Sequence, residues 1–172
     1  GIAARLHDIG KLSIPDNILK KPGKLDAAEY TLMKTHTTVG AELLSGSSVP
    51  EVIMAERIAR HHHEWWNGAG YPAGLKGTAI PVAARVTALA DVWDALTHVR
   101  PYKAAWPREA ALAHIESLSG VQFDPVLTKI FGQLIRDAER DWDAFHAHME
   151  DDARASPLVQ AQELTAALQA GG

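Results

Sequence analysis

The sequence predicts an all-α fold, and three observations support this prediction. Helix-start signals recur along the 172 residues: a capping-box pair, Asp26 and Glu29, and prolines where helices are expected to begin, Pro50, Pro81 and Pro107. Between these signals, apolar residues recur at intervals of three and four. Strand-like alternation is scarce, and the sequence has no internal repeat. We therefore expect a bundle of helices.

The expected helices can be placed in chain order. The opening stretch GIAARLHDIGK is typical of the last turns of a helix that begins upstream, and the capping box predicts a helix over about 27–45. The next helix begins at Pro50 and carries apolar residues at helical spacing to His62. Two later helices start at Pro107 and Pro125, the second running to about residue 153, and a final amphipathic segment starts at Pro157.

The helix expected after Pro81 has two distinct faces. One is an apolar stripe that we assign to the core, made of Val82, Val86, Leu89, Trp93 and Leu96. The other face places a carboxylate among small side chains, which leaves room for an ion or a ligand; it is made of Ala84, Ala88, Asp91 and Ala95.

Composition excludes several classes of function. The formal net charge of −4 gives no general attraction to nucleic acid or to an anionic membrane, so any phosphate recognition must be local. The absence of cysteine excludes disulfides and thiolate metal sites and fits a reducing compartment, so we expect a cytoplasmic location. No apolar run is long enough for a membrane span. Because the first residue is Gly1 rather than Met, we expect a fragment.

Potential metal ligands lie on four of the expected helical segments. A bundle that turned these segments inward would gather nitrogen and oxygen ligands around one cavity. Neighbouring helical residues diverge by about 100°, so an adjacent pair suits two ions better than one, and the two oxygens of an aspartate can bridge such ions. A site of this kind favours hydrolysis of phosphate esters. The groups are His7-Asp8 with Lys11, His36, His62-His63 with Glu64, and Asp91.

Five stretches resemble, in order, the motifs of the HD-GYP domain, a bacterial branch of the HD metal-dependent phosphohydrolases. They are HDIGKLSIPDNILKKPGKL, MKTHTTVG, HHEWWNGAGYPAGLKG, IPVAARVTALADVWDALT and RPYK, and the resemblance runs from about residue 4 to 130. The GYP triplet itself is Gly70-Tyr71-Pro72. The resemblance implies an HD-domain-like helical bundle with a glycine-rich GYP loop.

The resemblance also implies an activity and a set of site residues. The expected function is a phosphodiesterase that hydrolyses cyclic-di-GMP to pGpG, GMP or both, using two or three iron or manganese ions. The implied metal ligands are His7, Asp8, His36, His62, His63 and Asp91. Asp8 and Lys11 are the implied catalytic residues, Lys11 on the scissile phosphate, and the implied nucleotide contacts are Gly70, Tyr71, Arg100 and Lys103. His61 has no counterpart among the ligands and is expected on the surface.

Two departures from the family pattern stand out. The family contributes a further His, and in some members a Glu, from a helix upstream of His7, and this chain starts too late to contain them. Asn67 stands where the family often has Asp, and either residue suits a turn. We assign residues 1–135 to the catalytic domain and 136–172 to a C-terminal helical extension, and we expect an upstream regulatory domain in the full-length protein.

The sequence leaves two other functions open. One is a signalling adaptor that binds a diguanylate-cyclase (GGDEF) domain through the GYP surface. The other is an HD hydrolase that acts on another cyclic dinucleotide or nucleotide. Within the motif, Glu64 suits either a partner that orients a ligand imidazole or a salt bridge of the loop, and Trp65 and Trp66 are expected to pack the loop onto the bundle.

Overall fold

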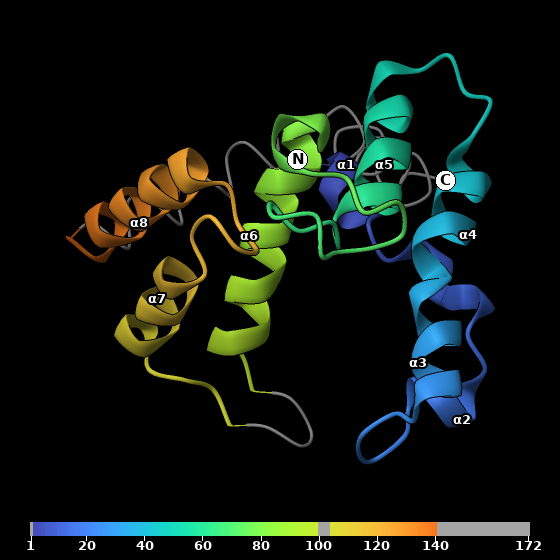
Figure 1. The fold of residues 1–172 in the computed structure, drawn as a ribbon, viewed down its shortest axis with the longest axis horizontal. Helices are drawn as coiled ribbons and strands as arrows, with labels where there is room; N and C mark the ends of the chain where they lie inside the picture. Colours follow the sequence, from blue (N-terminus) through green and yellow to red (C-terminus); the bar gives the residue numbers. More distant parts are fainter. Residues whose placement is uncertain (1, 100–103, 141–172) are drawn as a thin grey trace, which may run out of the picture. The chain divides into compact units, whose positions relative to one another are not determined.

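The computed structural model describes residues 2–99 and 104–140 (Figure 1). Within these ranges the chain is helical and forms no strand, apart from an isolated bridge between Ser119 and Phe123, and the predicted all-α class is confirmed. The elements are α1 (Ile2–Arg5), η1 (Ile9–Ser13), α2 (Asp16–Leu19), α3 (Ala27–Lys34), α4 (His36–Leu44), α5 (Pro50–His61), η2 (Gly77–Ala79), α6 (Val82–Thr97), α7 (Arg108–Ser117) and α8 (Pro125–Arg140).

The helix starts follow the predicted signals. The Asp26 carboxylate accepts the backbone N–H groups of Ala28 and Glu29, and the Glu29 carboxylate accepts the N–H of Asp26, so the capping box is complete. Pro50 is the first residue of α5, whereas Pro81 stands one residue before its helix, as its N-cap. Because proline has no N–H to leave unpaired, both positions suit it.

Two expectations about the helices are wrong. The helix predicted over 27–45 is two helices, α3 and α4, which meet at Thr35. On α6, the first two residues of the predicted core stripe, Val82 and Val86, are 57% and 49% exposed, whereas Ala84 and Ala88 on the small-residue face are buried. The small side chains let neighbouring helices approach closely, so packing follows size as well as hydrophobicity.

A close backbone contact fixes the segment that carries the HD pair. A Cβ at Gly10 in η1 would lie 1.9 Å from the carbonyl oxygen of His36 and 2.6 Å from the amide nitrogen of Gly40. Only glycine fits there, and η1 therefore lies directly against α4. The helix α5, which leads into the His62-His63 pair, packs against α1, α4 and α6. These four helices are therefore held together around the pair.

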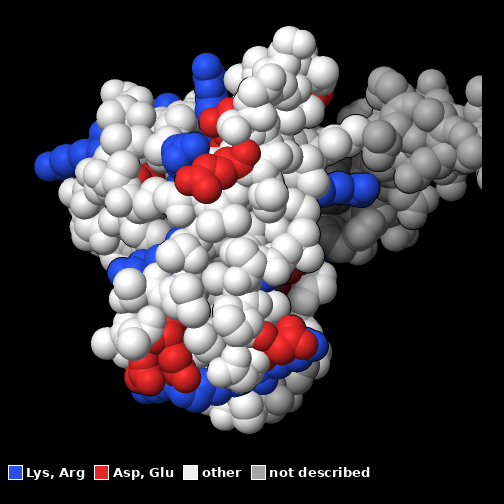
Figure 2. Space-filling view, turned by 90° about the vertical axis from the view of Figure 1, so that its right-hand side faces the viewer, with Lys and Arg blue, Asp and Glu red and all other residues white. Residues whose placement is uncertain are grey.

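The two hydrophobic clusters flank this arrangement. One joins α1 to α5 through Ala3, Ala55 and Ile58. The other joins α6, α7 and the start of α8, and its buried members are Ala88, Leu89, Leu96, Ala111, Ile115 and Phe123. On the face shown in Figure 2, acidic and basic side chains are interspersed, with no large patch of one sign, in keeping with the small net charge.

The chain divides into two compact units, Gly1–Gly132 and Gln133–Gly172. All the predicted site residues that the structure describes belong to the first unit. Of the second unit, only residues 133–140 are described, and they continue α8. Among the described helices, none combines the length and the apolar character needed to cross a lipid bilayer.

Candidate metal centre

The structure brings together the six residues predicted as metal ligands from four separate segments. His7 and Asp8 lie in the turn between α1 and η1, and His36 is the first residue of α4. His62 is the C-cap of α5, and His63 follows it. Asp91 lies in the middle of α6, which packs against α5.

Three of the imidazoles are oriented by backbone carbonyls of the preceding turn. The Nδ1 atoms of His7 and His36 each lie 2.7 Å from a carbonyl oxygen, those of Ala4 and Met33, and His62 Nδ1 lies 3.0 Å from the Ala59 carbonyl. A carbonyl only accepts, so each Nδ1 carries the proton and donates it. Each Nε2 is therefore left unprotonated in the neutral ring and available as a metal ligand.

The Nε2 atoms converge on the carboxylate of Asp8. His36 Nε2 lies 3.4 Å from His62 Nε2 and 3.4 Å from Asp8 Oδ1, and His62 Nε2 lies 3.8 Å from the same oxygen. On the other side, His7 Nε2 lies 3.7 Å from Asp91 Oδ1. His7 Nε2 and Asp8 Oδ1 are buried without a hydrogen-bond partner among the described residues. Buried polar atoms normally have partners, and a metal ion would supply one for both atoms.

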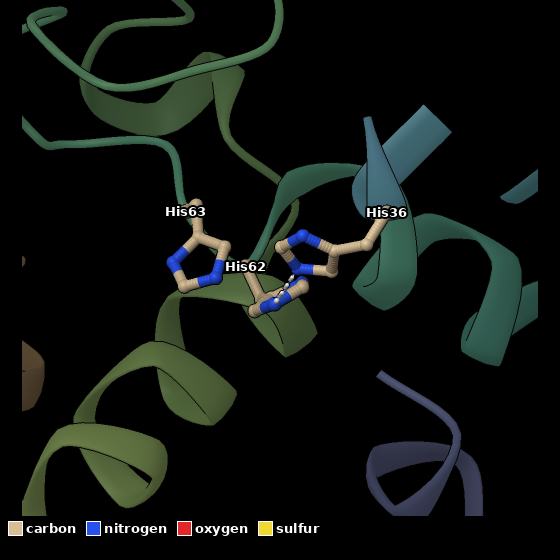
Figure 3. Close-up of side chains that lie close together, drawn as sticks. All are labelled: His36, His62 and His63. Carbon is tan, nitrogen blue, oxygen red and sulfur yellow. Dashed lines mark hydrogen bonds between the residues drawn. The ribbon is translucent and has the colours of Figure 1, made fainter. Parts of the chain in front are cut away.

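The candidate ligands form two groups that share His62. The ligand atoms of His36, His62 and His63 lie within 4.8 Å of one another, and so do those of His7, Asp8 and His62. In Figure 3, His62 lies between His36 and His63, and the rings of His62 and His63 are 4.1 Å apart. Imidazole and carboxylate groups at this spacing fit divalent transition-metal ions.

The reasoning that an adjacent pair such as His62 and His63 is poorly placed to bind one ion does not match the local geometry. It assumed that both residues continue the helix, where neighbours point about 100° apart. The last residue of α5 is His61, however, so His63 lies beyond the helix and its ring turns back toward His36, with the ring centroids 5.1 Å apart. Both histidines can therefore face the same point.

Burial keeps the inner histidines neutral. Desolvation lowers the pKa of His62 to about 4 and that of His63 to about 3, and it also lowers the pKa of His36. These rings carry no proton on the coordinating side at neutral pH, as metal ligation requires.

His7 behaves in the opposite way. The nearby carboxylates of Asp8, with Oδ2 3.3 Å from His7 Nε2, and then of Asp91 raise the pKa of His7 to about 10, against the effect of burial. Burial by itself would raise the pKa of Asp8, but the nearby His7 imidazole and the hydrogen bond from Lys11 outweigh it and hold that pKa well below its usual range. The nearby His7 imidazole likewise lowers the pKa of Asp91. His7 therefore acts as the cation between two carboxylates.

A lysine and a cavity adjoin the Asp8 side of the cluster. Lys11 Nζ lies 2.5 Å from Asp8 Oδ2. A cavity of about 420 Å³ opens beside these two residues, and its other walls are mainly apolar: Arg5, Ile9, Leu12, Ile14, Asp16 and Leu19. A volume of this order suits a small organic ligand.

The glycine loop, residues 64–77, begins directly at the histidine pair. A Cβ at Gly70 would lie 2.2 Å from the Trp65 nitrogen and 2.5 Å from the His63 carbonyl oxygen, so the loop folds back onto its own start. The residue after Gly70 then lies over the pair: the Tyr71 ring stacks on His63 with centroids 4.9 Å and planes 27° apart. Gly70 therefore packs against the backbone, which explains its identity without a ligand.

Glu64 holds the far side of this loop. Its carboxylate is buried and accepts the backbone N–H of Ala73 at 2.8 Å and that of Leu75 at 3.0 Å. Two roles were considered from the sequence. Orientation of a ligand imidazole by Glu64 is not observed among the described residues, whereas an ion-pair contact is, with His61 Nδ1 3.8 Å from Glu64 Oε1. In addition, Glu64 braces the loop through its backbone. Trp66 packs against α6, where the Arg85 guanidinium lies 5.7 Å from its ring.

Three further predicted residues need separate mention. His61 was expected on the surface, but its side chain is 16% exposed, its pKa is lowered by burial, and its Nδ1 is buried 3.8 Å from Glu64. The expectation failed because a position outside the ligand pattern can still face inward at the end of a helix. Arg100 and Lys103, predicted to contact the nucleotide, lie outside the described residues.

Comparisons with known proteins identify the family of the chain. A family model described as HD domain matches residues 1–127. The chain is 52% identical over 124 residues to a cyclic di-GMP phosphodiesterase response regulator of Xanthomonas campestris, covering 72% of this chain and 33% of that protein. It is 45% identical over 150 residues to a cyclic di-GMP phosphodiesterase of Thermotoga maritima, covering 84% and 41%.

A solved structure is similar as well. A crystal structure of a cyclic GMP-AMP-specific phosphodiesterase of Vibrio cholerae matches with a TM-score of 0.53 and 25% identity, covering 78% of this chain and 37% of that one. The chain thus spans between about a third and two fifths of the length of these proteins. The match over most of its residues, together with these relatives, shows that the chain belongs to the HD-domain family, in its HD-GYP branch.

Proposed function

We propose that this chain is a metal-dependent phosphodiesterase that hydrolyses cyclic di-GMP to pGpG, GMP or both. The observation that carries the proposal is the pair of ligand groups that share His62, in which two buried polar atoms, His7 Nε2 and Asp8 Oδ1, have no hydrogen-bond partner among the described residues. Relatives named as phosphodiesterases of cyclic di-GMP and of 3'3'-cGAMP support the same class of substrate.

The proposed ligands hold two divalent ions, with iron or manganese as the expected metals. The donor set is imidazole and carboxylate, and the absence of cysteine leaves no thiolate to favour zinc or copper(I). Bound ions would lower the pKa of water and accept charge from phosphate oxygens, which is the chemistry that hydrolysis of a phosphodiester needs. The proposed ligands are His7, Asp8, His36, His62, His63 and Asp91.

The remaining residues have proposed roles around the phosphate. Lys11, which donates to Asp8, exchanges that partner for an oxygen of the scissile phosphate and holds its developing negative charge. Arg100, Lys103 and Tyr71 contact the nucleotide. Residues 1–135 carry the reaction and 136–172 form an extension. A cytoplasmic site of action is in keeping with the absence of cysteine.

The test measures metal and turnover on the same samples. The chain, purified anaerobically with iron or manganese, is expected to hold about two ions and to hydrolyse cyclic di-GMP. Asp91→Ala removes one ligand and is expected to lose both metal and turnover. Asp94→Ala, three residues further along α6 with a side chain that is 61% exposed, is the matched control and keeps both. If the chain with its full metal content leaves cyclic di-GMP intact, the proposed substrate is refuted. If the same chain cleaves 3'3'-cGAMP and not cyclic di-GMP, 3'3'-cGAMP becomes the proposed substrate instead.

A second candidate is an adaptor that binds a GGDEF domain through the glycine loop. It is favoured by the exposure of Pro72, Ala73 and Gly74 at the tip of a loop that Glu64 holds in one conformation. Pull-down of a GGDEF domain by the metal-free chain, weakened by Tyr71→Ala, supports this role. Equal capture by wild type and variant argues against it.

A further inference from the structure

A line of aromatic rings leads from the histidine cluster to the surface. His63 stacks on Tyr71. The Tyr71 ring in turn meets the ring of Tyr30, on α3, edge to face at 6.4 Å with planes 79° apart. Three segments of the chain, α3, the end of α5 and the glycine loop, therefore contribute to this line of rings.

A lysine lies over this line of rings. The Lys34 ammonium is 5.2 Å from the centroid of Tyr30 and 5.9 Å from that of Tyr71. No described carboxylate forms an ion pair with Lys34, whereas Lys20 pairs with Asp16 on the neighbouring helix α2. The positive charge of Lys34 is therefore held by ring faces and stays available to an anion.

Helix packing does not account for this cluster. Tyr30 and Lys34 are four residues apart on the same face of α3, and such a pair stabilises a helix by only about 0.2–0.5 kcal/mol. No residue of α3 is buried, and Tyr30 itself is 49% exposed. A large aromatic side chain is thus left half in solvent at the outer end of the line of rings.

We propose that Tyr30 and Lys34 form a second subsite for the cyclic dinucleotide, in which the Tyr30 ring stacks on one purine base and Lys34 donates to the phosphodiester that is not being cut. The inference rests on the proposed function. A cyclic dinucleotide presents two bases and two phosphates, and the metal centre engages one phosphate at a time. The other half of the ligand has to be held by groups outside the ion cluster, and the line of rings leads there.

The kinetic test compares a cyclic dinucleotide with a small diester that has no base. Loss of a base–aromatic stack is typically worth tenfold or more in affinity. Tyr30→Leu and Lys34→Met are each expected to raise the KM for cyclic di-GMP about tenfold, while kcat/KM for bis(p-nitrophenyl) phosphate falls less than about twofold. Tyr30→Phe, which keeps the aromatic ring, is expected to have the KM of the wild type. Lys20→Met, which removes another lysine that is 71% exposed, is the matched control.

Two results overturn the subsite. One is an unchanged KM for cyclic di-GMP in Tyr30→Leu and Lys34→Met. The other is an equal loss on both substrates, because damage to the fold or to the metal centre affects the small diester as well.

The subsite and the proposed reaction can fail separately. A chain that leaves cyclic di-GMP intact refutes the reaction, and calorimetric titration of the same metal-loaded chain with cyclic di-GMP then tests the subsite directly. Binding that Tyr30→Leu weakens about tenfold supports the subsite. Equal binding by both proteins, or no binding by wild type, overturns it.

Discussion

Removal of the Glu64 carboxylate should loosen the glycine loop and destabilise the whole first unit. The side chain is fully buried and accepts two backbone N–H groups, those of Ala73 and Leu75. A hydrogen bond to a charged group contributes about 1.5–3 kcal/mol, but Ala73 is exposed, so water can replace the partner it loses. We therefore expect Glu64→Ala to lower the free energy of unfolding by about 2–4 kcal/mol. Glu64→Gln keeps one accepting oxygen and should lose about half as much.

The assay is urea unfolding followed by far-ultraviolet circular dichroism, with EDTA present so that metal binding does not contribute. Glu56→Ala, on α5, is the control, because that side chain is 29% exposed and lies 3.7 Å from Arg60. Its loss should stay below about 1 kcal/mol. A loss of less than about 1 kcal/mol for Glu64→Ala, or no difference between Glu64→Ala and Glu56→Ala, would refute the bracing role.

Three further predictions concern the loop and the histidines. Gly70→Ala should lower the free energy of unfolding by about 2–3 kcal/mol, because its Cβ would lie 2.2 Å from the Trp65 nitrogen; an unchanged urea midpoint would contradict this contact. The metal-free chain should lose stability as the pH falls from 6.5 toward 4, because the unfolded state protonates His62 and His63 there and the folded state does not. The expected slope is about 1.4 kcal/mol per pH unit for each histidine, and a flat urea midpoint between pH 6.5 and 5 would rule it out. Finally, metal binding at pH 7.5 should release about one proton from His7, because its pKa of about 10 keeps the ring protonated before metal binds. Calorimetric titration with metal in two buffers of different ionisation enthalpy measures the number of protons released. A value of zero would contradict the prediction.

The fold was predictable where a local signal determines the backbone. Asp26 and Glu29 satisfy the first N–H groups of α3 through side chains that are close in sequence, and Pro50 can only begin a helix. The junction at Thr35 has no such signal, since threonine occurs both within helices and between them. Likewise, the face of α6 that packs inward depends on the helices next to it. Val82 is the more hydrophobic residue but is exposed, whereas the smaller Ala84 is buried, so hydrophobicity alone does not predict the buried face.

The site was predictable as a set of residues but not as a geometry. Residue types and their order identified the candidate ligands, from His7 to Asp91. The convergence of their Nε2 atoms depends on contacts between segments distant in sequence, such as Gly10 against α4. The roles of Glu64 and Tyr30 depend on loop closure, which no spacing rule describes. A tyrosine four residues before a lysine was the available sequence signal for the proposed subsite, but such pairs are common on helices.

The sharing of His62 between the two ligand groups limits how many protein donors the ions can have. With its Nδ1 committed to a backbone carbonyl, a neutral imidazole keeps a single lone pair, which can serve one ion at a time. Whichever group used His62 would leave the other one donor short, so two ions, if both bound, would not share this donor. An ion held by fewer protein donors would leave room for solvent and a phosphate oxygen. A centre built in this way trades tight retention of its metals for room in which to carry out chemistry.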